Sequence, residues 1–223
     1  MSALPPDLRA RILQTARSEP SPTRAETLKR AWIAVALGAV ASLALSLKLG
    51  TPPTAVRPPL YIALAAGGAA LFAVVATWLA ASRGGSMLGR SRASLIAIAA
   101  LLPVALLAWC VFGSAVLGEP QVPGASMAAH TACFVFTSLF ALGPLVAFAY
   151  LRRGSDPVHP RALGAALGAA AGAWGTMLIN AHCAFTSPAH VAFGHVLPVA
   201  LLAAVGALIG GRLFGVRSGA SPR

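Results

Sequence analysis

Apolar residues form six long runs along the chain, separated by short segments in which Pro, Gly and Arg recur, such as Thr51-Pro52-Pro53 and Arg152-Arg153-Gly154. The runs lack the polar–apolar alternation of transmembrane barrel strands. Each is about 20 residues long, enough to cross the roughly 30 Å hydrocarbon layer of a bilayer as a helix. In lipid such a helix satisfies its own backbone amides. The six predicted spans are Trp32–Leu49, Leu60–Ala81, Ala93–Leu117, Met127–Leu151, Ala162–Ala181 and Val191–Phe214.

The composition favours a membrane protein over a soluble one. Of the 223 residues, 57% are hydrophobic and only 10% are charged, whereas about a quarter of a soluble domain is charged. Three cysteines do not make a disulfide scaffold. We therefore predict an all-α membrane protein, a six-transmembrane-helix bundle. A tail over residues 1–31 would precede a transmembrane domain over 32–214, and a second tail would cover 215–223.

The basic residues predict the orientation. All but two of the 17 Lys and Arg residues lie in or next to the two tails and the second and fourth loops, and the exceptions are Lys48 and Arg57. Loops rich in Lys and Arg stay in the cytoplasm. We therefore expect both termini to be cytoplasmic, which requires an even number of spans. In a membrane chain this excess of positive charge is first an orientation signal rather than a sign of nucleic-acid binding.

The predicted spans offer no obvious acidic relay for energy-coupled transport, and the chain lacks common hydrolase motifs. All five acidic residues lie outside them, although pumps and active transporters usually carry ionisable groups within their spans. The chain has no His-Glu-x-x-His metalloprotease motif and no Gly-x-Ser-x-Gly nucleophile elbow. Gly164, Gly168 and Gly172 recur every four residues and predict a flat face for close helix packing. We predict no enzymatic activity.

The N-terminal tail is the stretch best suited to bind a soluble partner. Asp7 is placed to cap a short helix with an apolar side, and Thr23-x-x-Glu26 is a capping box that starts a helix running into the first span. Two interpretations stay open: the short helix rests on anionic lipid, or it docks in a groove of a cytoplasmic protein. The candidate partner-binding residues are Leu4, Leu8, Arg9, Arg11, Ile12 and Leu13.

Thiols and imidazoles gather toward the predicted outer side. They suit a soft or borderline metal ion such as zinc or copper, and thiols are also oxidisable. The alternative is that they only pack, as lone Cys and His residues often do. The candidate metal or sensor cluster is His182, Cys183, His190 and His195, with His130 and Cys133 as second-rank members.

The six-span layout, the short amphipathic tail and the pair His182-Cys183 before the last span resemble a bacterial family of membrane-bound anti-sigma factors, the negative-regulator-of-sigma-F type. The family's His-Cys pair is usually followed by Pro, whereas Ala184 stands here. The tail also resembles that of light-responsive anti-sigma regulators of carotenoid synthesis.

These resemblances imply a multi-pass protein of the bacterial inner membrane. Its tail would hold an extracytoplasmic-function sigma factor without direct contact to nucleic acid, and an envelope, light or oxidative signal would release the partner. A small six-helix metal or solute permease is the alternative. A permease would change uptake or metal sensitivity when deleted, whereas an anti-sigma factor would derepress transcription.

Overall fold

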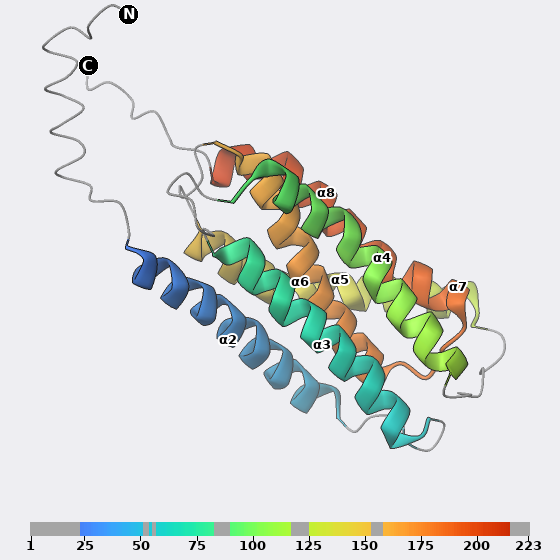
Figure 1. Cartoon of the computed structure of the whole chain (residues 1–223). Helices are drawn as coiled ribbons and strands as arrows, with labels where there is room; N and C mark the ends of the chain where they lie inside the picture. The colour runs from blue at the N-terminus through green and yellow to red at the C-terminus, as the bar shows by residue number, and fades with distance from the viewer. Residues whose placement is uncertain are drawn as a thin grey trace, which may run out of the picture.

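The computed structural model is a bundle of long helices (Figure 1) and describes residues 23–50, 54, 57–82, 90–116, 125–152 and 158–214. In chain order its elements are α2 (Arg24–Leu49), α3 (Pro59–Ala81), α4 (Arg92–Val116), α5 (Met127–Leu151), α6 (Pro160–His182), α7 (Pro188–His190), the π-helix η1 (Val191–Val196) and α8 (Leu197–Leu213). The last three elements follow one another without a break and form one span. Six helices in this part of the chain are therefore long and apolar enough to cross a membrane.

The predicted all-helical class and the six long helices are confirmed. Five of the six begin within about three residues of the predicted start. The first begins earlier, at Arg24 rather than at Trp32, because the predicted capping box forms. The hydroxyl of Thr23 accepts a hydrogen bond from the amide of Glu26 at 3.2 Å, and the Glu26 carboxylate accepts one from the amide of Thr23 at 2.8 Å.

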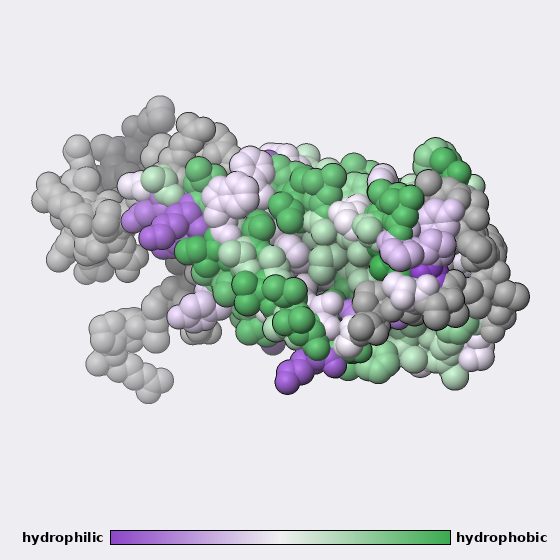
Figure 2. Space-filling model, turned by 90° about the horizontal axis from the view of Figure 1, so that it is seen from below, coloured by the Kyte–Doolittle hydropathy of each residue, from purple (hydrophilic) through white to green (hydrophobic). Residues whose placement is uncertain are grey.

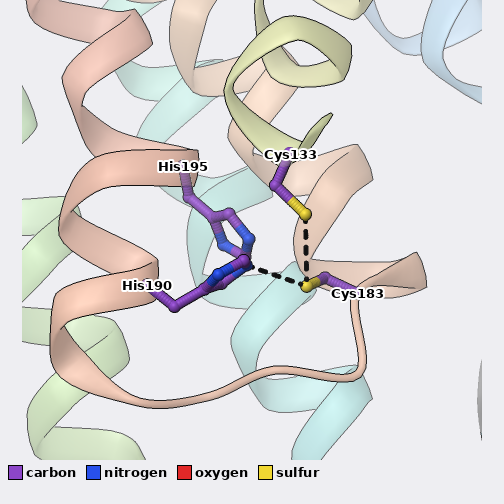
Figure 3. A group of neighbouring side chains, drawn as sticks. All are labelled: Cys133, Cys183, His190 and His195. Carbon is purple, nitrogen blue, oxygen red and sulfur yellow. Dashed lines mark hydrogen bonds between the residues drawn. The ribbon is translucent and has the colours of Figure 1, made fainter. Parts of the chain in front are cut away.

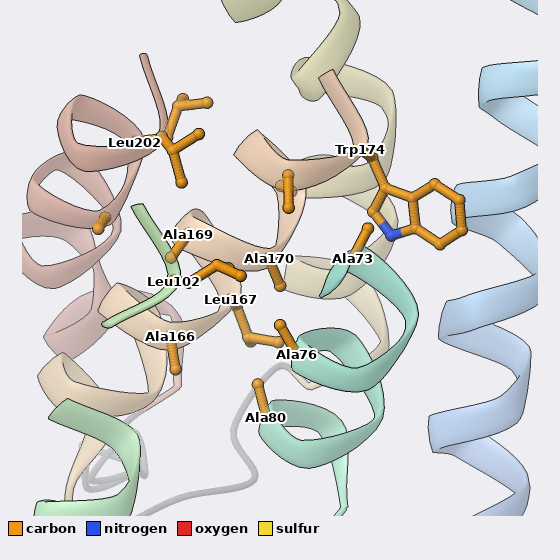
Figure 4. Packing of buried hydrophobic residues seen from close by; sticks show 14 of the residues in the cluster. Ala73, Ala76, Ala80, Leu102, Ala166, Leu167, Ala169, Ala170, Trp174 and Leu202 are labelled. Atoms are coloured by element: carbon orange, nitrogen blue, oxygen red, sulfur yellow. The ribbon is translucent and has the colours of Figure 1, made fainter. Parts of the chain in front are cut away.

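Helix α6 is the centre of the bundle, with α3, α4, α5 and α8 packed around it (Figure 1). In its most apolar stretch 83% of the residues are buried inside the protein, against 22–44% for the other five spans. Figure 4 shows how small side chains permit this packing: Ala166, Ala169 and Ala170 of α6 lie between the alanines of α3 and Leu202 of α8. The small side chains therefore let these helices approach closely.

The glycine face predicted on α6 lies against α8. A Cβ atom added to Gly164 would collide with the carbonyl oxygen of Gly206, and one added to Gly168 would collide with that of Leu202. At Gly172 the added atom would lie 2.7 Å from the Cα of Val199. The two backbones are thus in near contact over more than two turns, and the prediction of a packing face is confirmed.

The outward faces of the surrounding helices are apolar. Large exposed side chains include Val40 of α2, Leu71 of α3, Leu101 and Phe112 of α4, and Leu208 of α8. Figure 2 shows hydrophobic residues across the middle of one face of the molecule. A soluble protein rarely exposes so continuous an apolar surface. The six apolar helices therefore indicate a multi-pass membrane protein.

Candidate functional site

Four side chains from different parts of the chain meet at one end of the bundle (Figure 3). Cys133 comes from the first turns of α5, Cys183 directly follows α6, and His190 and His195 come from the start of the last span. One sulfur or ring nitrogen from each residue lies within 4.8 Å of those of the other three. We call these four residues the Cys/His cluster.

The contacts inside the cluster centre on Cys183. Its sulfur lies 3.6 Å from the sulfur of Cys133 and 3.3 Å from Nε2 of His190. The imidazole rings of His190 and His195 are 5.2 Å apart between centroids and nearly perpendicular, at 84°. The backbone of Cys183 lies just outside the spans, and the pKa of its thiol is lowered chiefly because the Cys133 side chain hydrogen-bonds to it.

The two histidines share one face because the backbone between them is a π-helix. Residues five positions apart point about 140° away from each other in an α-helix. The wider i→i+5 turn of η1 brings them to nearly the same face. Pro198 has no amide hydrogen to donate to the carbonyl of Gly194. That carbonyl instead accepts a hydrogen bond from the Thr137 hydroxyl of α5 at 2.9 Å, and the irregular turn is thereby satisfied inside the bundle.

Asn180 of α6 orients His195. Its side-chain oxygen lies 2.7 Å from Nδ1 of His195. Because that oxygen can only accept, Nδ1 carries the proton and Nε2 keeps its lone pair. The ring is 1% exposed, and its Nε2 has no hydrogen-bond partner among the described residues. A buried lone pair thus faces the two sulfurs.

Arg57 holds the backbone at the end of α6. This residue is one of the two basic exceptions to the charge pattern, and it is only 4% exposed. Its guanidinium donates hydrogen bonds to the carbonyl oxygens of Asn180 at 3.1 Å and of Cys183 at 2.9 Å. These carbonyls belong to the last residues of a helix and the residue after it, which otherwise lack partners. The loop that carries Cys183 is therefore fixed at its start.

A cavity of about 500 Å³ opens beside the two cysteines, between α2, α5 and α6. Its wall is mostly apolar and includes Leu49, Phe136 and Phe140. Cys133, Cys183 and His182 also line it. The thiol pair is therefore accessible to small molecules on one side and buried against the histidines on the other.

The structure brings together three of the four first-rank candidates and adds Cys133 from the second rank. His182 lies outside the cluster, because its Nε2 pairs with the Ser46 hydroxyl of α2 at 3.0 Å. His130 lies beside the cluster: its ring is 4.8 Å from that of His190, while its Nδ1 is 2.8 Å from the carbonyl oxygen of Ser126. The tail candidates Leu4, Leu8, Arg9, Arg11, Ile12 and Leu13 lie outside the described residues.

The sequence did not single out Asn180 or Arg57 for the site. Arg57 carried a signal, since it is a basic residue on the side that lacks them. The π-helix carried a weaker signal: Pro198 lacks the amide hydrogen that a regular α-helix through His195 would use. Asn180 is a polar residue three positions before Cys183, near the end of an otherwise apolar span, and it was the clearest missed signal.

Comparison with known proteins gives one family match. The model of the family "negative regulator of sigma F" matches residues 15–215. No curated protein and no solved structure matches the chain. The family consists of regulators of a sigma factor and is not an enzyme family. Because the match covers most of the chain, including every residue of the Cys/His cluster, this protein belongs to the negative-regulator-of-sigma-F family.

Proposed function

We propose that this protein is a membrane-bound anti-sigma factor that holds an extracytoplasmic-function sigma factor at the bacterial inner membrane and releases it on an envelope, light or oxidative signal. The observation that carries the proposal is the family match over residues 15–215. A sigma factor held at the membrane cannot join RNA polymerase, so the protein acts as a repressor of transcription. Carotenoid-synthesis genes are the targets that we propose.

The arrangement of the helices supports an orientation with both termini in the cytoplasm. α2 and α6 begin, and α8 ends, at the same end of the bundle (Figure 1). Among the described basic residues, Arg90, Arg152 and Arg212 belong to that end, whereas Arg57 lies at the end with Cys183. The positive-inside rule then directs the Cys/His cluster outward.

The tail over residues 1–31 is the segment that we propose for sigma-factor capture, through Leu4, Leu8, Arg9, Arg11, Ile12 and Leu13. The family match begins at residue 15, so these residues precede it. An apolar side with arginines around it suits a groove on an acidic protein surface. Capture in the cytoplasm and sensing at the outer end would then occupy opposite ends of the bundle.

Helix α6 is the element suited to couple the two ends. Its 23 residues span about 35 Å at 1.5 Å per residue, from the cytoplasmic loop to the residue before Cys183. Coupling requires two arrangements of the bundle whose balance the outer end changes. The glycine contact between α6 and α8 is the contact that we propose to shift, because no side chains interlock there.

Deleting the gene and purifying the complex together test this function. Deletion is expected to raise transcription from promoters that the sigma factor reads, and the tagged full-length protein is expected to retain that sigma factor on membranes. Retention must fall when residues 1–22 are removed. Unchanged transcription in the deletion strain, together with a change in metal or solute uptake, would instead support a permease.

A further inference from the structure

We propose that Cys133, Cys183, His190 and His195 form a tetrahedral binding site for a soft divalent cation of the zinc and cadmium class. The inference gives the outer end of the proposed anti-sigma factor a ligand. The binding itself can be measured on the protein alone, without a sigma factor.

The distances fit such an ion. Two sulfurs at about 2.3 Å from a tetrahedral zinc ion lie about 3.8 Å apart, and a sulfur and a nitrogen ligand lie about 3.6 Å apart. The sulfurs of Cys133 and Cys183 are 3.6 Å apart, and the Cys183 sulfur is 3.3 Å from Nε2 of His190. These two separations match the tetrahedral values within a few tenths of an ångström, and all four ligand atoms lie within 4.8 Å of one another, so the remaining side chains close on the ion by moving toward it. The donor set of two thiolates and two imidazoles is one that zinc prefers.

His195 is oriented as a metal ligand before any ion binds. Metal-bound histidines usually donate their other ring hydrogen to a nearby oxygen, which fixes the tautomer and the ring orientation. Asn180 provides that oxygen at 2.7 Å. The opposite nitrogen, Nε2, is buried without a partner among the described residues. A buried polar atom without a partner costs free energy, and a cation at the centre of the cluster would satisfy it.

The charges balance when the ion binds. Two neutral thiols lose their protons, and two sulfur–metal bonds and two nitrogen–metal bonds form around a divalent cation. Two thiolates and one such cation sum to zero, so no net charge remains among the buried histidines, which are 0% and 1% exposed. The two protons leave to the solvent.

Gly194 leaves room for the cluster because it has no side chain. A Cβ atom at this position would lie 3.0 Å from the Cβ of Cys133 and 3.5 Å from Nε2 of His190. The added atom would press on Cys133 and come into van der Waals contact with His190. The glycine lies in the middle of the π-helix, so η1 both aligns His195 with His190 and leaves room beside them.

An ion at this site would join three separate parts of the bundle: the start of α5, the loop after α6, and the start of the last span. Cys183 already contacts the other two parts, through the sulfur of Cys133 and through Nε2 of His190. Occupancy would therefore favour one arrangement of α5, α6 and α8 over others, which is the property that a sensor requires.

The test uses the purified full-length protein in detergent, stripped with a chelator and titrated with Zn²⁺, Cd²⁺ and, as a spectroscopic probe, Co²⁺. We expect one ion per chain and a thiolate-to-cobalt absorption band. Cys183→Ser and His195→Gln should each weaken Zn²⁺ binding at least tenfold. Cys110→Ser and His182→Gln are the matched controls, since they change a cysteine and a histidine outside the cluster, and they should leave binding unchanged.

Circular dichroism checks that each variant keeps its helices. If a cluster variant does not fold, the wild-type protein still decides the question through alkylation: bound Zn²⁺ should slow the labelling of both Cys133 and Cys183. Absence of stoichiometric binding in the wild type, or equal loss in His182→Gln and Cys183→Ser, would overturn the site. Metal binding without sigma-factor capture would overturn the proposed function and leave the site in place.

Discussion

Asn180 and His195 meet across the contact between α6 and η1, where the asparagine oxygen lies 2.7 Å from Nδ1 of the histidine. This hydrogen bond decides which ring nitrogen faces the sulfurs of Cys133 and Cys183. It also links the central helix of the bundle to the Cys/His cluster. A displacement of His195 is therefore transmitted through Asn180 to α6, the helix that the other spans surround.

Replacing Asn180 with Leu is expected to weaken Zn²⁺ binding by about 10- to 100-fold, the usual effect of removing a hydrogen-bond partner of a metal ligand. The variant keeps all four ligands but leaves Nδ1 of His195 without its acceptor. Competition titration against a chromogenic chelator measures the affinity. Thr77→Val is the matched control, since it removes another buried hydrogen bond, from Trp174 at 3.0 Å, and should leave the affinity unchanged. Equal affinities for wild type and Asn180→Leu would contradict the orienting role.

Replacing Gly168 with Ala is expected to destabilise the bundle by about 1–3 kcal/mol, the usual effect of overpacking. The new methyl group would collide with the carbonyl oxygen of Leu202, and backbone must move to admit it. Gly67→Ala in α3 is the control, because a Cβ there meets nothing within 4 Å and alanine favours a helix. Thermal unfolding in detergent compares the two. A Gly168→Ala protein as stable as Gly67→Ala would show that the helices are not in close contact.

The charge pattern predicts the membrane topology. A reporter that is active only in the cytoplasm should work when it is fused after Arg30, Gly85 or Gly154. A reporter that is active only outside the cytoplasm should work after Val122 or Ser187. Cytoplasmic activity at Ser187 would place the loop next to the Cys/His cluster inside the cell, and the six-span orientation would then be abandoned.

The apolar side of the tail is tested by Leu8→Asp combined with Ile12→Asp. Burying unpaired charge in a contact costs several kcal/mol, which weakens a micromolar complex by orders of magnitude. Co-purification of the sigma factor with the full-length protein should therefore fall to background, while membrane insertion stays normal. Ala220→Asp combined with Ser218→Asp adds the same charges to the other tail and serves as the control. Wild-type capture by the first variant would exclude this side of the tail.

The fold was largely predictable because lipid leaves few choices. A long apolar run must be a helix in a bilayer, and Thr23 with Glu26 shows where the first one begins. The membership of the cluster was less predictable. Cys133 and Cys183 are 50 residues apart in the sequence, and the neighbours His182 and Cys183 point to different partners because α6 ends between them.

The π-helix is a second reason why the cluster was harder to predict than the fold. A regular α-helix would place His190 and His195 on different faces. In the sequence these two histidines group together because both lie toward the predicted outer side, and their five-residue spacing does not support the grouping. Their alignment depends on a wide turn that Pro198 and Thr137 stabilise together. Such a turn is set by tertiary contacts between spans, which a single sequence does not display.

The last prediction tests whether the Cys/His cluster senses the signal. Replacing Cys183 with Ser and His190 with Gln removes two ligands with little change in size. Repression without the signal should stay normal, since the tail is unchanged. Induction by light, oxidant or Cd²⁺ should be lost, so that the ratio of induced to uninduced expression of the target genes falls toward one.

The matched control for this variant replaces Cys110 with Ser and His182 with Gln. It changes the same residue types outside the cluster, where Cys110 contacts Asn180 and His182 contacts Ser46, and induction should persist. Target-gene transcripts are measured for both strains with and without each signal. If the cluster variant loses induction by one signal alone, that signal is the stimulus that acts through these ligands. Coupling to the tail is common to all the signals, so a fault in the coupling would abolish every response. Unchanged induction in the cluster variant would mean that these residues only pack and that another protein senses the signal.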